Sequence, residues 1–263
     1  MASVGIDDEI KTDLYVACET GNTERLRQLL QEGADPNVGH QHERQEKWTA
    51  LHIASHKGNY ECVEILLEFK EILDIAVDAT DSRGDTPLRV ACFAGNSECA
   101  RVLLDHGADP NKLCELHSTP MYAACQAGDM ACIRLLLDRD ADPEVKTKFG
   151  LTPLHVACKH DHPEVVDLLL AHGVNPNVRG QYGHAPLHTA CFHNSAVCVC
   201  LLLCHGGNPV QMSDRGNTPL RVADLNAPNC ARMIRAHMSN SKKRERSTDD
   251  KVEPPTKRAR NDE

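Results

Sequence analysis

The chain has 263 residues and a formal net charge of −9, and 41% of its residues are apolar but only 3% are aromatic. A core can therefore form, built mainly from Leu, Val, Ala and Cys. No run approaches the roughly 18 apolar residues that span a bilayer, and the acidic first residues contain no apolar signal segment. We expect neither a membrane protein nor a secreted one, but a protein of the cytoplasm or the nucleus.

The charges and the cysteines exclude further classes. Residues 239–263 carry eight Lys or Arg and six Asp or Glu, which gives +2 and leaves −11 for the other residues. An acidic body with a basic end is not typical of a nucleic-acid binder, whose body is basic. The thirteen cysteines, an odd number in a chain without a signal segment, indicate free thiols rather than a disulfide framework.

One unit recurs along residues 1–238. Aligned on the Thr of a Thr-Pro-Leu-His motif, its copies start near residues 12, 49, 86, 119, 152, 185 and 218. The steps between them are 37, 37, 33, 33, 33 and 33 residues. So regular a spacing predicts an array of seven similar structural units.

Each copy contains the start and stop signals of two helices. Thr152 suits an N-cap and Pro153 a first helical residue, where a missing N–H costs nothing. Nine residues after the anchor the first four repeats have a Gly, such as Gly95, and Asp161 and Asn194 occupy the same position in the next two. Gly and Asn tolerate the left-handed conformation that ends a helix. A second apolar segment follows and stops at another Gly, such as Gly107, before an Asp-Pro or Asn-Pro turn. Every unit is therefore predicted to be a pair of helices.

This pattern resembles the ankyrin repeat over most of the chain, because Thr-Pro-Leu-His-x-Ala, the helix-ending Gly and the closing Gly-Ala-Asp-x-Asn recur in register. The resemblance implies an all-α solenoid of about seven helix pairs with short β-hairpin fingers. One pair cannot bury its apolar face alone, whereas stacked neighbours can. We expect each buried Leu to contribute roughly 1.5–3 kcal/mol, and Leu169 in a middle repeat to matter more than Leu29 near the end.

Several copies depart from the pattern. Residues 38–47, and four extra residues after the second helix of repeat two, are expected to lengthen finger loops. Asp13 and Tyr15 in the first repeat and the polar end of the last repeat are typical of capping units. Asp161 replaces the helix-ending Gly in repeat five, which predicts a small loss of stability.

The histidines and cysteines of the repeats are predicted to be structural. His52, His155 and His188 share one motif position, where other repeats carry Arg or Tyr, and the resemblance implies that each bonds neighbouring backbone. Cys198, Cys200, Cys204 and His205 are close in sequence, but they contain no Cys-x-x-Cys pair and do not share one helical face, so we predict no metal site. No phosphate-binding loop or hydrolase motif occurs, and we predict neither enzymatic activity nor a cofactor.

In ankyrin-like stacks the variable positions lie on the finger tip and at the exposed end of the first helix, at −4, −3, −1, +7 and +8 from the anchor. Even scattering would place about one of the nine aromatic residues at these positions in repeats two to seven, yet five occupy them. Aromatic side chains are enriched at recognition surfaces. We predict that a protein or peptide binds along a concave groove centred on repeats three to six. The predicted contacts are Trp48, Arg83, Phe93, Leu116, Phe149, Leu151, His160, Tyr182, Phe192 and His193. Lys159, His184 and Arg215 are on the same face. In the alternative, Trp48 and Phe149 only cover neighbouring fingers.

Residues 239–263 are predicted to be a disordered basic tail, because they contain too few apolar residues to offset ordering. Two clusters in it, Lys243–Arg244 and Lys257–Arg258 with Arg260, resemble a bipartite nuclear localisation signal that an import receptor reads. In the alternative, the tail is only a solvated segment. Ser247, followed by acidic residues, is a candidate phosphorylation site that would tune import.

Together these features predict a non-enzymatic interaction scaffold, monomeric and present in both nucleus and cytoplasm. One alternative is a substrate-recognition subunit of a ubiquitin ligase, since ankyrin proteins with a SOCS box have similarly Cys-rich repeats. Residues 239–263 are too polar to supply that box. Another is an inhibitor or co-regulator of a transcription factor, whose basic signal would face the acidic body. Direct nucleic-acid or membrane binding is not predicted, because only the tail is basic.

Overall fold

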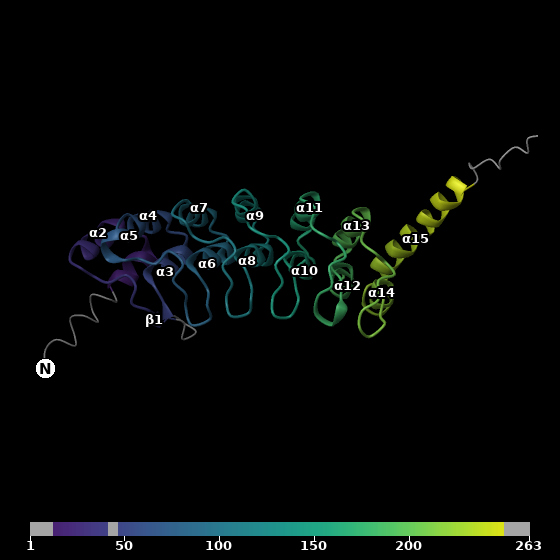
Figure 1. Cartoon of the computed structure of the whole chain (residues 1–263), viewed down its shortest axis with the longest axis horizontal. Helices are drawn as coiled ribbons and strands as arrows, with labels where there is room; N and C mark the ends of the chain where they lie inside the picture. Colours follow the sequence, from purple (N-terminus) through teal and green to yellow (C-terminus); the bar gives the residue numbers. More distant parts are fainter. Residues whose placement is uncertain (1–12, 42–46, 250–263) are drawn as a thin grey trace, which may run out of the picture.

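A computed structural model describes residues 13–41 and 47–249, and the chain forms one row of stacked helix pairs (Figure 1). Residues 13–20 are helical and pair with α2 (Thr23–Gln31). The first helices of the next six repeats are α3 (Ala50–Lys57), α6 (Pro87–Ala94), α8 (Pro120–Ala127), α10 (Pro153–Lys159), α12 (Pro186–Phe192) and α14 (Pro219–Asn226). Their second helices are α4 (Tyr60–Glu68), α7 (Ser97–Asp105), α9 (Met130–Leu137), α11 (Pro163–Ala171), α13 (Ala196–Cys204) and α15 (Pro228–Asp249). The all-α repeat fold is as predicted.

The helix ends follow from the residues identified in the sequence. The hydroxyls of Thr86, Thr119 and Thr218 accept from the backbone N–H three residues later, and Pro occupies the first helical position. Gly95 ends α6 with a φ of 75°. Asp161 and Asn194 take the corresponding left-handed conformation with φ of 55° and 58°, which a side chain adopts at some cost.

A single core runs along the stack. From α3 onwards each first helix packs on the first helix of the next repeat, and from α2 onwards the second helices do the same. The motif Leu, or its Met substitute in repeat four, is buried in repeats two to six, as Leu51, Leu88, Met121, Leu154 and Leu187, whereas Leu220 in repeat seven is only partly buried. Both Leu29 and Leu169 are fully buried, so burial alone does not distinguish the end repeat from the middle one.

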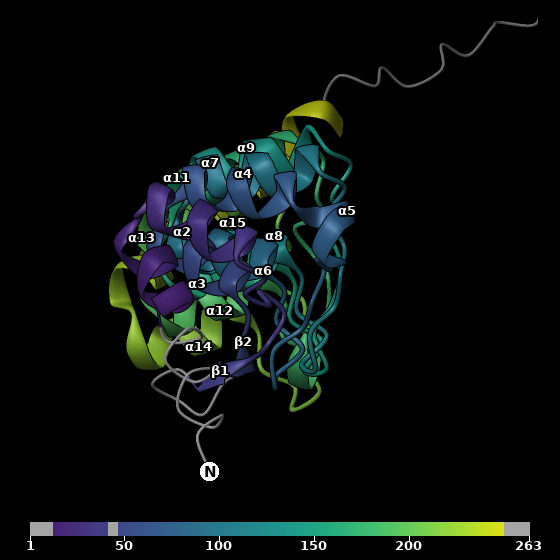
Figure 2. The ribbon, with the colours of Figure 1, turned by 90° about the vertical axis from the view of Figure 1, so that its left-hand side faces the viewer.

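Between repeats, a finger projects from the side of the first helices, and the end-on view shows the fingers following one another along the stack (Figure 2). In each finger of repeats three to seven, one backbone N–H bonds the carbonyl four residues later, as Thr147 does with Leu151. Neighbouring fingers are joined by backbone bonds such as Lys148 N–H to the Leu116 carbonyl. Within the described ranges only the first finger contains β-strands, the antiparallel pair β1 (His40–Gln41) and β2 (Lys47–Trp48).

The four extra residues of repeat two do not lengthen a finger, contrary to expectation. They form the short helix α5 (Lys70–Leu73) directly after α4, and Asp74, with a φ of 49°, ends it where other repeats have Gly. The finger that follows keeps the ordinary pattern, with Asp81 N–H bonded to the Asp85 carbonyl. In the insertion at residues 38–47, His40–Gln41 form β1 and Lys47 begins β2 of the first finger, and residues 42–46 lie outside the described residues.

The boundary predicted at residue 239 falls inside a helix, because α15 continues to Asp249. Residues 239–249 contain no Gly or Pro and several good helix formers, so the helix continues although its apolar pattern stops. The helix α15 thus extends into the segment predicted to be a disordered tail, and the remainder of that segment lies outside the described residues. Among the described helices, none has both the length and the apolar character that crossing a bilayer requires.

Candidate functional site

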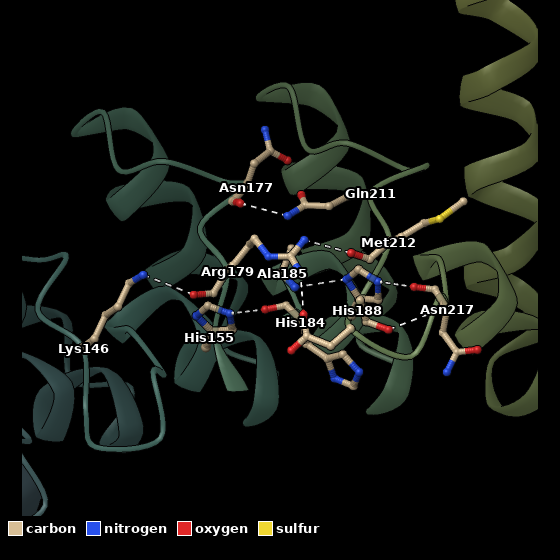
Figure 3. Close-up of polar contacts among 12 residues, drawn as sticks. Lys146, His155, Asn177, Arg179, His184, Ala185, His188, Gln211, Met212 and Asn217 are labelled. Atoms are coloured by element: carbon tan, nitrogen blue, oxygen red, sulfur yellow. Dashed lines mark hydrogen bonds and ion pairs between the residues drawn. The ribbon is translucent and has the colours of Figure 1, made fainter. Parts of the chain in front are cut away.

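The motif histidines bridge successive repeats, as predicted. Nδ1 of His155 accepts from the Thr152 N–H at 3.2 Å, and Nε2 donates to the His184 carbonyl of the next finger at 3.1 Å (Figure 3). His52 and His188 bond the carbonyls of Asp85 and Asn217 in the same way. Burial lowers the pKa of all three and brings that of His155 to about 4. They are therefore neutral structural groups rather than exposed bases.

Further ties hold the fingers of repeats five to seven together. Nζ of Lys146 donates to the Arg179 carbonyl at 3.2 Å (Figure 3). The Arg179 guanidinium in turn donates to the Met212 carbonyl and pairs with Asp214 at 2.6 Å. Side-chain and backbone hydrogen bonds thus hold neighbouring fingers of repeats five to seven to one another. The side chains at the finger tips project from this bonded framework.

Five predicted side chains are large, apolar and solvent-exposed: Phe93, Leu116, Phe149, Tyr182 and Phe192. Their exposed fractions range from 49% for Phe93 to 62% for Phe192. We call the finger positions −4 and −3 and the helix positions +7 and +8 of repeats three to seven the finger–helix face. Because equal offsets fall in line along a regular stack, Phe149 and Tyr182 lie on neighbouring fingers. The core does not use these side chains.

Trp48 does not belong to this face, which corrects its prediction as a partner contact. It is 5% exposed, its Nε1 donates to Asp81 at 3.1 Å, and its ring packs near His52 and His56. The cause is its offset of −1, which places it at the base of the finger rather than the tip. Leu151, at the same offset in repeat five, is only partly exposed, so it is at most a minor part of the surface.

The predicted polar residues of the face differ between its two ends. Arg83 is exposed, but its guanidinium lies 3.4 Å from the buried carboxylate of Asp85, within its own repeat. His160 and His193 are exposed at the ends of α10 and α12, next to Lys159. Burial, and then the positive charge of Lys159, lowers the pKa of both histidines. Arg215 lies over the Tyr182 ring, with Cζ 5.6 Å from its centroid.

One exposed side chain of the face was missed. Leu225, at offset +7 of repeat seven, is 78% exposed and continues the line of Phe93 and Phe192. Its offset alone could have identified it, whereas the enrichment of aromatic residues could not. The face therefore extends one repeat further than the predicted centre in repeats three to six.

The cysteines form no metal site in the part of the chain that the structure describes. All thirteen are free, and only Cys200 and Cys204 are exposed. Burial raises the pKa of Cys62 to about 11 and that of Cys191 to about 12, so these two thiols are packed as neutral groups. No group of three or more candidate ligands comes together within the described ranges.

Lys243, Arg244 and Ser247 lie in α15, whereas Lys257, Arg258 and Arg260 lie outside the described residues.

Comparisons with known proteins agree with this architecture. The family model described as ankyrin repeats (3 copies) matches residues 14–114 and 107–180, and the one described as ankyrin repeat matches residues 182–214. The crystal structure of the human ASB11 ankyrin repeat domain is 29% identical with a TM-score of 0.73, and the match covers 85% of this chain and 96% of that one. The ankyrin repeat domain of Bcl-3, a unique member of the IkappaB protein family, is 27% identical with a TM-score of 0.70 and covers 85% and 97%. A search of curated protein sequences found no significant match.

Proposed function

Since the chain belongs to the ankyrin-repeat family, we propose that it is a monomeric, non-enzymatic scaffold that binds a protein or peptide partner on the finger–helix face. The observation that carries this proposal is the line of exposed Phe149, Tyr182 and Phe192 on fingers and helix ends that are themselves tied to the core. Aromatic side chains dominate the energetics of protein interfaces. Contact of these apolar side chains with water is unfavourable, and a bound partner would cover them.

The test compares two triple variants in pull-down from a cell lysate followed by mass spectrometry. Phe149→Ala/Tyr182→Ala/Phe192→Ala is expected to lose the bound partner while its thermal unfolding is unchanged. The matched control, Ile72→Ala/Val197→Ala/Val210→Ala, removes exposed apolar side chains away from the face and is expected to keep it. Binding that survives the aromatic triple unchanged contradicts the proposal.

The identity of the recovered partner distinguishes between two narrower roles. The Cys-rich repeats, as in residues 132–137, favour a substrate-recognition subunit of a ubiquitin ligase, which would recover cullin machinery. The acidic body favours an inhibitor or co-regulator of a transcription factor, which would recover DNA-binding proteins. Similarity to the domains of ASB11 and Bcl-3 does not choose between them, because the two identities are nearly equal.

We also propose that the two basic clusters at Lys243–Arg244 and Lys257–Arg260 direct import, so that the protein divides between nucleus and cytoplasm. A fluorescent fusion of Lys257→Ala/Arg258→Ala/Arg260→Ala should leave the nucleus. The neighbouring Asn261→Ala/Asp262→Ala/Glu263→Ala should behave as wild type. Phosphorylation of Ser247 would lower the positive charge between the clusters, so Ser247→Asp should reduce the nuclear fraction and Ser247→Ala should not. If the Lys257→Ala/Arg258→Ala/Arg260→Ala fusion stays in the nucleus, the proposed localisation signal is rejected.

A further inference from the structure

The finger–helix face carries positive charge towards its C-terminal end, although the body of the protein is strongly acidic. In repeats five to seven the face contains Lys148, Lys159 and Arg215 and one carboxylate, Asp214. That carboxylate already pairs with Arg179 at 2.6 Å. By contrast, repeat three neutralises its own charge, because Asp85 pairs with Arg89 at 2.7 Å and with Arg83. Repeat four contributes the exposed Glu115.

The positive charge is concentrated next to the aromatic side chains. The rings of His160 and His162 stack with centroids 6.1 Å apart, and Phe192 contacts His193 edge-on at 5.1 Å. Burial, and then the positive charge of Lys159, lowers the pKa of His160, so Lys159 supplies the charge here and the imidazoles supply ring N–H donors. Asp161, the nearest carboxylate in sequence, accepts from the Cys198 thiol at 3.7 Å. An anion held between Lys159, His160 and His193 would pair with the ammonium group and accept from the imidazole N–H groups.

Resting on the proposed function, we propose that the partner segment is an acidic peptide. Its apolar side chains pack on Phe149, Tyr182 and Phe192, and an Asp or Glu side chain sits against Lys159, His160 and His193. Interfaces juxtapose opposite potentials, and this patch is positive within an acidic protein, so the complementarity would fix the direction in which the peptide lies. A nucleic acid is also anionic, but its repeating phosphates would be repelled by a body of charge −11.

The test is a selection of random dodecapeptides displayed on phage against the full chain. Phage that also bind the Phe149→Ala/Tyr182→Ala/Phe192→Ala variant are removed first. The expected survivors combine Asp or Glu with Leu, Phe or Trp. Survivors without acidic enrichment overturn the acidic-peptide proposal but leave the proposed function standing. If no peptide depends on the three aromatic residues, both fail.

Charge reversal then locates the anion. Lys159→Glu should weaken a selected peptide at least about tenfold. Lys112→Glu, an equal change at an exposed lysine outside the face, should change its affinity less than about twofold. Equal losses in the two variants, or displacement of the peptide by oligothymidylate, would overturn the assignment.

Discussion

Two histidines of repeat five, five residues apart on and just after α10, have opposite roles. His155 is 1% exposed and neutral, and its two ring nitrogens bond Thr152 and the finger of repeat six. His160 is exposed beside Lys159, and within the described part of the chain its ring forms no hydrogen bond to another repeat. The same residue type therefore stabilises the stack at one offset and is available for binding at the other. Offset from the anchor, more than residue type, separates stability from recognition in this chain.

The largest expected effect is in the core of repeat five. Leu169→Ala should lower the free energy of unfolding by about 2–5 kcal/mol, because Leu169 is fully buried and its neighbours cannot fill the cavity. Chemical denaturation measures this loss. Leu29→Ala near the N-terminal end is the comparison, and an equal or larger loss there would contradict the greater weight expected for the middle of the stack.

Acid should remove the contribution that the buried His155 makes to the stability of the fold. The pKa of His155 falls from 6.5 to about 4 on folding, so its contribution is complete above pH 6.5 and is lost as the pH falls towards 4. At about 1.4 kcal/mol per pH unit, the part of the free energy of unfolding that is lost over this pH range is ~3 kcal/mol. Denaturation curves between pH 7 and 4 should show a shallower pH dependence for His155→Gln than for wild type. Parallel dependences would show that His155 protonates in the folded protein without difficulty.

Removing each histidine in turn tests the comparison directly. His155→Ala should destabilise by about 1–3 kcal/mol, because it leaves the Thr152 N–H and the His184 carbonyl without their bond. His160→Ala should stay within about 0.5 kcal/mol of wild type. Thermal or urea unfolding of the pair measures both values, and similar losses in the two variants would remove the distinction.

The smallest effect is expected at the end of α10. Asp161 holds a φ of 55°, so Asp161→Gly should stabilise by less than about 1 kcal/mol. The gain is reduced by loss of the contact with Cys198. Gly128→Ala, at the same place in repeat four, is the opposite change and should destabilise, because its φ is 76° and an added Cβ would meet the His162 ring at 2.8 Å.

The repeat pattern predicts most of the fold, since anchor, caps and Gly positions act locally. It also identifies the bridging histidines, because their bonds recur with the period. Trp48 was wrong as a contact because its burial depends on Asp81 in the next finger, a tertiary contact that spacing does not encode. The helix α5 and the continuation of α15 were missed because helix propensity extended both beyond the apolar pattern.

The buried cysteines give this stack a property of a different kind. Every repeat contains at least one thiol that solvent does not reach, among them Cys18, Cys62, Cys99, Cys132, Cys158, Cys191 and Cys230. A thiol of this kind reacts with an alkylating reagent only when its own repeat opens, so its rate of modification reports the local opening equilibrium. The chain thus carries a built-in probe in each unit, from which fraying at the ends can be compared with opening in the middle without introducing any label.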